Sequence, residues 1–349
     1  MLIGSAASIM AAAGLSALAT AVALAYARRR GLVDLPGRRR SHALPTPRGG
    51  GVGIVLAVLV VGLAPAAAAG LGWALPLAVA FLSVAAIGWI DDHRPLSARL
   101  RLLVHLLAAA LAAGALLGWP VSAGGWVLLA ATILALAWST NLHNFVDGID
   151  GLLGLQASAV FALLAGFALA AGDESLARLA AVAAAASAAF LPFNLPRARV
   201  FLGDVGSGAL GLLVGALSVA AWRRGVLDPG ALLMLSSACL VDATATLLSR
   251  VLRGRRWWRP HREHLYQWLV RTGSSHPRVA LAYLGWTLGV VPLLLAVRAV
   301  MHASPPAGAS PRLVESLYSI GWPAATLLIA TGLWWAGKRA CLRRAGSRA

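Results

Sequence analysis

Long apolar runs, separated by short polar loops, recur along the whole chain. A helix needs about 20 apolar residues to cross the ~30 Å hydrocarbon core of a bilayer. Eleven runs approach that length, at about residues 3–27, 50–69, 73–90, 102–118, 123–140, 152–171, 176–193, 206–222, 230–249, 279–300 and 313–337. They do not alternate apolar with polar residues, which favours helices over a membrane barrel. The sequence therefore predicts an all-α, polytopic membrane protein of about eleven transmembrane helices.

The composition excludes several other classes of protein. Charged residues make up 12% of the chain and hydrophobic residues 59%, whereas soluble domains carry about 25% charged residues. This excludes a disordered chain and argues against an ordinary soluble enzyme. Two cysteines are too few for a disulfide scaffold or a cysteine-based zinc cluster. We expect one integral membrane domain over residues 1–349, and no nucleic-acid partner, because the bases lie between apolar runs.

The distribution of Lys and Arg predicts the orientation in the membrane. Loops that follow odd-numbered runs, together with the C-terminal tail, hold 25 of the 30 basic residues. Basic loops remain in the cytoplasm, so we expect the N-terminus outside and the C-terminus inside. The first run ends in Arg28-Arg29-Arg30 rather than at a cleavage site, which indicates a retained helix.

Acidic residues gather on the same predicted face. Asp91, Asp92, Asp147, Asp150 and Asp204 all fall at or beside run ends in cytoplasmic loops. Carboxylates at such positions cost stability unless they are paired or bind a cation. Convergence on one divalent metal ion is the economical explanation.

The pair Asp91-Asp92 ends the third run. Adjacent carboxylates can hold Mg²⁺ directly or through water, because Mg²⁺ prefers oxygen ligands, and one of them could act as a base. The alternative is a solvated helix end, with Arg94 and Arg99 as ion-pair partners.

A second motif reads Asn141-x-x-Asn144-x-x-Asp147-Gly-Ile-Asp150-Gly151. Its first three polar residues are spaced by three, which predicts one face of a helical turn. The following glycines expose backbone N–H groups that could meet a phosphate or a base. A capped turn without a ligand is the alternative.

A third motif combines Asn194 with Phe201-Leu-Gly-Asp204-Val-Gly-Ser-Gly at the start of the eighth run. A helix N-terminus offers free N–H groups and a partial positive charge, which suits phosphate. Asp204 could instead be only an N-cap, and Phe201 could stack on a base or simply pack.

Two basic loops complete the candidate site. Arg48 precedes Gly49-Gly50-Gly51, which suits a tight loop that meets a phosphate, although such bases can simply fix topology. The loop 250–278 mixes Trp and Arg, which is typical of an interfacial element. Its His261 and His264 are phosphate contacts or surface residues. Asp242 is the one acid deep inside a run, with a functional role or a structural hydrogen bond as alternatives.

Together, these motifs resemble the polyprenyl-phosphate N-acetylhexosamine-1-phosphate transferase family, glycosyltransferase family 4, from about Pro45 to Gln267. The resemblance implies that a lipid phosphate attacks the β-phosphorus of a UDP-N-acetylhexosamine and displaces UMP, with Mg²⁺ as cofactor. Undecaprenyl phosphate is the expected lipid. The implied location is the bacterial inner membrane with a cytoplasmic site, and a homodimer is left open.

The resemblance also implies roles for individual residues. Asp204 matches the metal-binding aspartate, with Asn144 placed to assist it. The implied catalytic residues are Asp91, Asp92, Asp147, Asp204 and His264. The implied substrate-binding residues are Arg48, Asn141, Asp150, Asn194 and Phe201.

The chain departs from the family's His-x-His-His stretch after His264, because Tyr266 and Gln267 stand at the last two positions. This departure favours the branch that initiates O-antigen and similar envelope glycans over phospho-MurNAc-pentapeptide transferase. We expect the loop 250–278 to select the substrate. A membrane transporter or lipid flippase is the alternative function, and a nonenzymatic scaffold is the third.

Overall fold

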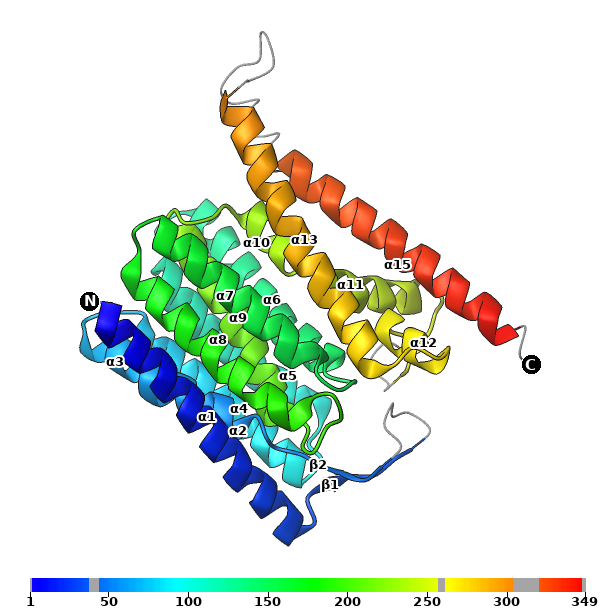
Figure 1. The fold of residues 1–349 in the computed structure, drawn as a ribbon. Helices are drawn as coiled ribbons and strands as arrows, with labels where there is room; N and C mark the ends of the chain where they lie inside the picture. Colours follow the sequence, from blue (N-terminus) through cyan, green and yellow to red (C-terminus); the bar gives the residue numbers. More distant parts are fainter. Residues whose placement is uncertain (1, 38–43, 257–260, 304–319, 347–349) are drawn as a thin grey trace.

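The computed structural model describes residues 2–37, 44–256, 261–303 and 320–346, and they are almost entirely helical (Figure 1). In these ranges the one sheet is a short antiparallel pair, β1 (Val33–Asp34) with β2 (Thr46–Pro47), in which Val33 faces Pro47. The prediction of an all-α polytopic membrane protein is therefore confirmed.

The helices follow one another with short connections. They are α1 (Leu2–Arg30), α2 (Val52–Ala57), the π-helical η1 (Val58–Leu63), α3 (Ala64–Ala68), α4 (Ala74–His93), α5 (Ala98–Leu117), α6 (Ala123–Val146), α7 (Leu152–Ala170), α8 (Glu174–Asn194), α9 (Asp204–Arg223), α10 (Pro229–Leu235), α11 (Ser237–Leu252), α12 (Leu265–Arg271), α13 (His276–Ala303) and α15 (Trp322–Gly346).

Each of the eleven predicted runs contains helix, but the runs differ in how they could cross a membrane. Among the described residues, eight helices are long and apolar enough to span a bilayer. A ninth span counts α10 and α11 together, which meet at an 82° bend. The run at 50–69 forms a shorter apolar stretch, Val52–Ala68. Residues 313–319 of the last predicted run lie outside the described residues.

Helix α9 is the centre of the bundle. It contacts α4, α5, α6 and α7, and 78% of the residues in its most apolar 18-residue stretch are buried. Its glycines and alanines allow neighbouring backbones to approach closely. At Gly88 of α4, for example, a Cβ atom would collide with the backbone of Asp204. This close packing brings the ends of α4 and α6 to the N-terminus of α9.

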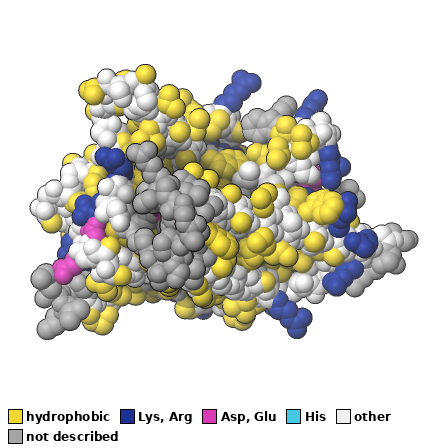
Figure 2. Space-filling model, turned by 90° about the horizontal axis from the view of Figure 1, so that it is seen from above, with side chains coloured by type: hydrophobic (Ala, Val, Ile, Leu, Met, Phe, Trp, Pro, Cys, Tyr) yellow, Lys and Arg dark blue, Asp and Glu magenta, His cyan; other side chains and the backbone are white. Residues whose placement is uncertain are grey.

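The outer surface of the bundle is apolar. Figure 2 shows hydrophobic side chains over much of the visible face, with Lys and Arg mainly toward its edges. Large apolar side chains along the helices, such as Leu18, Leu107 and Leu328, are strongly exposed. An exposed apolar belt of this kind is what contact with lipid requires.

Candidate functional site

The C-terminal turn of α4 meets the first turn of α9. Asp92 of α4 is buried, and its carboxylate accepts hydrogen bonds from the backbone N–H groups of Asp204 and Val205, both at 3.2 Å. These N–H groups have no partner within their own helix. Asp92 therefore caps α9 and fixes the position of Asp204 relative to α4.

Gly203 makes this approach possible. Its φ is +78°, a conformation that residues with a Cβ rarely adopt. A Cβ at this position would stand 2.5 Å from Oδ2 of Asp92. The glycine is therefore needed both for the turn and for the contact.

Arg101 links two further carboxylates. Its Nη1 donates to Oδ2 of Asp91 at 2.8 Å and to Oδ2 of Asp204 at 2.9 Å. Arg101 lies in the first turn of α5, directly after the loop in which Leu96 N–H donates to Asp91 at 2.6 Å. Arg101, and neither of the predicted alternatives Arg94 and Arg99, is therefore the ion-pair partner of Asp91.

The end of α6 supplies the next group of side chains. Nδ2 of Asn144 donates to Oδ1 of Asp204 at 2.9 Å and to the Ser207 hydroxyl at 3.0 Å. Asp147 follows as the C-cap of α6. Burial, together with the negative charges of Asp204, Asp92 and Asp150, raises the pKa of Asp147 to about 8. The crowding of carboxylates that the sequence predicted is therefore present here.

Asn141 does not join this group. Its Nδ2 donates to the Ala137 carbonyl at 2.7 Å, and its side chain also interacts with His105 of α5. The expectation that Asn141, Asn144 and Asp147 share one face is wrong for Asn141. Each residue of an α-helix turns by about 100°, so residues six apart lie about 120° apart around the axis.

A cavity of about 230 Å³ opens beside these side chains. It is lined by Asp34, Arg48, Asp92, Asp147, Gly148, Ile149, Asp150, Asn194, Phe201, Gly203, Asp204, Gln267 and His276. Asp91 and Asn144 do not line it; Asn144 contacts Asp204, which does, and Asp91 is joined to Asp204 by Arg101. Of the predicted substrate-binding residues, four of five line the cavity, and Asn141 does not.

The loops around the cavity are tied together through Asn194 and Asp150. Oδ1 of Asn194 accepts from Gly151 N–H at 2.6 Å, and its Nδ2 donates to the Val200 carbonyl at 2.9 Å. Oδ2 of Asp150 accepts from Ala198 N–H at 3.2 Å. These bonds join the turn between α6 and α7 to the loop that precedes α9.

Arg48 lies on a loop that pairs with the same segment. Phe201 N–H donates to the Pro47 carbonyl at 2.8 Å, and Gly50 N–H donates to the Phe201 carbonyl at 2.9 Å. The Arg48 guanidinium is then 3.9 Å from Oδ1 of Asp92. The Arg48 guanidinium, on the loop between β2 and α2, therefore faces the carboxylate of Asp92.

His264 lies next to the cavity but does not line it. It is buried at the N-cap of α12, and its ring lies 6.4 Å from the ring of Phe145 and 5.0 Å from that of His261. Gln267 and His276, which the sequence analysis did not name as site residues, do line the cavity. Nδ1 of His276 is 3.3 Å from Asp150 N–H and 3.3 Å from its Oδ2.

The chemistry of these side chains suits a hard divalent cation. Asp91, Asp92, Asp147 and Asp204 supply carboxylate oxygens, and Asn144 supplies an amide, which are the ligand types that Mg²⁺ prefers. Within the described residues, however, no three His, Cys, Asp or Glu side chains stand ready as a metal-binding group. Asp91 and Asp204 instead share the Arg101 guanidinium.

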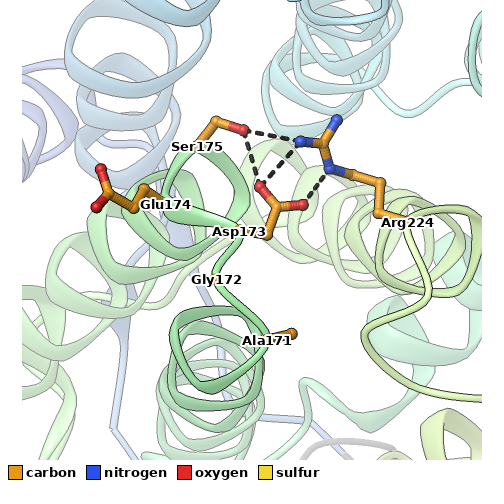
Figure 3. Close-up of a pocket in the computed structure, with 6 residues that line it drawn as sticks. All are labelled: Ala171, Gly172, Asp173, Glu174, Ser175 and Arg224. Atoms are coloured by element: carbon orange, nitrogen blue, oxygen red, sulfur yellow. Dashed lines mark hydrogen bonds and ion pairs between the residues drawn. The ribbon is translucent and has the colours of Figure 1, made fainter.

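A shallow surface pocket lies at the opposite ends of α7, α8 and α9 (Figure 3). Asp173 and Arg224 form an ion pair there, and Ser175 hydrogen bonds to both. Burial raises the pKa of Asp173, but hydrogen bonds from Arg224, Leu176 N–H and Ser175 outweigh it, so the pKa lies below its usual value. None of the predicted site residues lies in this pocket.

Comparisons with known proteins point to one family. Residues 74–221 match the model of "Glycosyl transferase family 4". The chain is 33% identical to a decaprenyl-phosphate N-acetylglucosaminephosphotransferase of Mycolicibacterium smegmatis, in an alignment of 319 positions that covers 80% of this chain and 78% of that protein. It is 26% identical to a probable undecaprenyl-phosphate N-acetylglucosaminyl 1-phosphate transferase of Bacillus subtilis, over 70% of this chain and 72% of that protein. It is 34% identical to a phospho-N-acetylmuramoyl-pentapeptide-transferase of Synechococcus elongatus, over 50% of this chain and 54% of that protein.

Proposed function

Because the chain belongs to glycosyl transferase family 4, we propose that it transfers an N-acetylhexosamine-1-phosphate from a UDP-sugar to a polyprenyl phosphate. An oxygen of the lipid phosphate forms a bond to the β-phosphorus of the UDP-sugar. The bond from that phosphorus to the bridging oxygen breaks, and UMP leaves. One phosphoanhydride replaces another, so the main barrier is the approach of two anions.

One observation carries this proposal. Carboxylates from α4, the end of α6 and α9 line one cavity with Arg48 at the ends of apolar helices, and Arg101 pairs with Asp204 behind that lining. A lipid phosphate can reach such a site while its prenyl tail remains among the membrane spans. An enzyme that acts on two water-soluble substrates would not need a site at the end of a bundle of apolar helices.

Acidic and basic side chains of the site have separate roles in this proposal. Asp204, with Asn144 donating to its Oδ1, is the best placed side chain to hold Mg²⁺, with Asp91 and Asp92 on either side. The cation would neutralise charge on the diphosphate. Arg48 and Arg101 can bind phosphate oxygens, and fixed positioning of both anions supplies much of the remaining catalysis.

The donor side of the cavity differs from the acidic side. Asp150, Asn194, Phe201 and Gln267 line it, and an aromatic ring with amide and carboxylate groups suits a uridine. We assign substrate selection to the loop 250–278 because Gln267 and the neighbouring His276 reach the cavity. Residues 257–260 of this loop lie outside the described residues. His264 is buried and does not line the cavity, so we assign it no direct step in the transfer.

The location and pathway complete the proposal. The basic loops support a cytoplasmic site in a bacterial inner membrane. The reaction would initiate a cell-envelope glycan of the O-antigen kind. Two relatives are named for N-acetylglucosamine, so UDP-N-acetylglucosamine is the first donor to test.

The test is UMP release by the purified protein with UDP-N-acetylglucosamine, Mg²⁺ and undecaprenyl phosphate. We expect release that requires both lipid and Mg²⁺, and a lipid product of the mass of the diphosphate-linked sugar. Asp204→Asn should abolish it, whereas Asp173→Asn, at the opposite ends of the helices, should retain it. Turnover by Asp204→Asn at the normal rate, or transport of an unaltered sugar across proteoliposomes, would overturn the proposal.

A further inference from the structure

Asp242 of α11 is the meeting point of four helices. Its Oδ1 accepts from Leu265 N–H of α12 at 2.7 Å and from the Trp334 indole N–H of α15 at 2.9 Å. Its Oδ2 accepts from the Tyr283 hydroxyl of α13 at 2.7 Å and from Tyr266 N–H at 3.3 Å. Asp242 is 2% exposed, so protein donors surround its carboxylate.

Helix α12 depends on this carboxylate. It has seven residues, and an isolated helix of that length is not stable in water. The first N–H groups of any helix lack partners within the helix. Asp242 accepts from two of them, at Leu265 and Tyr266, while Oε1 of Gln267 accepts from His264 N–H at 3.3 Å.

Helix α12 in turn reaches the cavity through Gln267. The Tyr266 hydroxyl donates to the Phe145 carbonyl at the end of α6 at 2.9 Å and lies directly against Gly148. Gln267, the next residue, lines the cavity together with Asp147 and Asp150. A shift of α12 would therefore move Gln267 and release the turn that carries Asp147 and Asp150.

We propose that Asp242 is a positioning residue that holds α12 against the end of α6 and so shapes the nucleotide side of the cavity. Asp242 does not line the cavity itself, and it acts through Tyr266 and Gln267 of α12. The inference rests on the proposed function only in taking this cavity as the nucleotide site. This positioning role differs from the ion-carrying role that an acid inside the membrane would have in a transporter.

The test compares matched variants. Asp242→Asn removes the negative charge and replaces one acceptor oxygen with an NH₂ group. That NH₂ group faces N–H and O–H donors and cannot accept from them. Tyr283→Phe removes one bond to Asp242. Thr287→Val, one turn further along α13, is the control, because it removes a buried hydroxyl that donates to Gln156 of α7 at 2.8 Å and does not contact α12. All are measured as full-length protein.

Two readouts separate positioning from general stability. The first is amide hydrogen exchange in residues 265–271, and the second is the Kd for UMP. Loss of a buried, charge-assisted hydrogen bond corresponds to about a tenfold change in an equilibrium. We expect about tenfold faster exchange and about tenfold weaker UMP binding for Asp242→Asn. Tyr283→Phe should shift both in the same direction by less, and Thr287→Val should shift neither.

Other outcomes overturn the inference. They are unchanged UMP binding in folded Asp242→Asn or Tyr283→Phe, and equal exchange in α12 for the Tyr283→Phe and Thr287→Val variants. If Asp242→Asn does not fold, Tyr283→Phe and a Trp334→Phe variant carry the test. If the wild-type protein bound UMP but transferred no sugar, the proposed function would fail while both readouts still decided the role of Asp242.

Discussion

At the residue scale, Arg101 is the side chain on which the acidic cluster most depends. It places one positive charge between Asp91 and Asp204. We expect Arg101→Gln to lower kcat/KM for UMP release by about 100-fold, because a charged donor to both the carboxylates and the substrate phosphates is lost. The rate of Arg101→Lys should lie between those of Arg101→Gln and the wild type, since lysine keeps the positive charge but not the planar guanidinium that carries Nη1 to both carboxylates.

Arg99→Gln is the matched control, because Arg99 is an exposed neighbour with no ion pair among the described contacts. Equal rates for the Arg99 and Arg101 variants would show that the bridge between the carboxylates has no part in the reaction.

Gly203 provides a second prediction at this scale. Gly203→Ala should destabilise the protein by about 1–3 kcal/mol and reduce turnover, because it strains a positive φ and crowds Asp92. Gly225→Ala has a similar φ of +71° with open space around it, so it should cost only the backbone strain. Thermal unfolding in detergent measures both, and a larger loss for Gly225→Ala would contradict the argument.

At the element scale, the ion pair between Asp173 and Arg224 joins the turn between α7 and α8 to the end of α9. The pKa of Asp173 is lowered in the folded protein. The resulting stability is therefore present above the unfolded pKa near 3.8 and is lost as pH falls through the lower folded pKa. Arg224 is partly exposed, so the contribution should not exceed about 1 kcal/mol.

The measurement is the difference in thermal midpoint between wild-type protein and Asp173→Asn. We expect a small, constant difference from pH 5 to 8 that shrinks as pH falls below about 3.8. A difference that grew with acidity would reverse the sign of this prediction. UMP release should not change, because this pair lies at the opposite helix ends from the acidic cavity.

The elements also show how far the sequence could predict the site. Asp92, Asp147 and Asp204 stand at run ends, so hydropathy alone placed them on one face. Arg101 and His276 each lie in the first turn of a helix. Hydropathy does not predict which way a side chain at such a position points. The break between α10 and α11 was not visible either, because both halves are apolar and only packing decides the 82° bend. Gln267 was missed because α12 forms through contacts with Asp242, far away in sequence.

At the scale of the whole molecule, the asymmetry of charge predicts which ends of the helices face the cytoplasm. Four loops that together carry 20 of the 30 basic residues also adjoin the residues that line the acidic cavity. Pro95→Cys lies in such a loop and Ala171→Cys in a loop on the other side, and both positions are exposed. In intact cells, a membrane-impermeant maleimide should label Ala171→Cys, whereas Pro95→Cys should react only after permeabilisation. The native Cys239 and Cys341 are buried, so the unaltered chain is the background control. Labelling of Pro95→Cys from outside would invert the topology and place the cavity where cytoplasmic UDP-sugars cannot reach it.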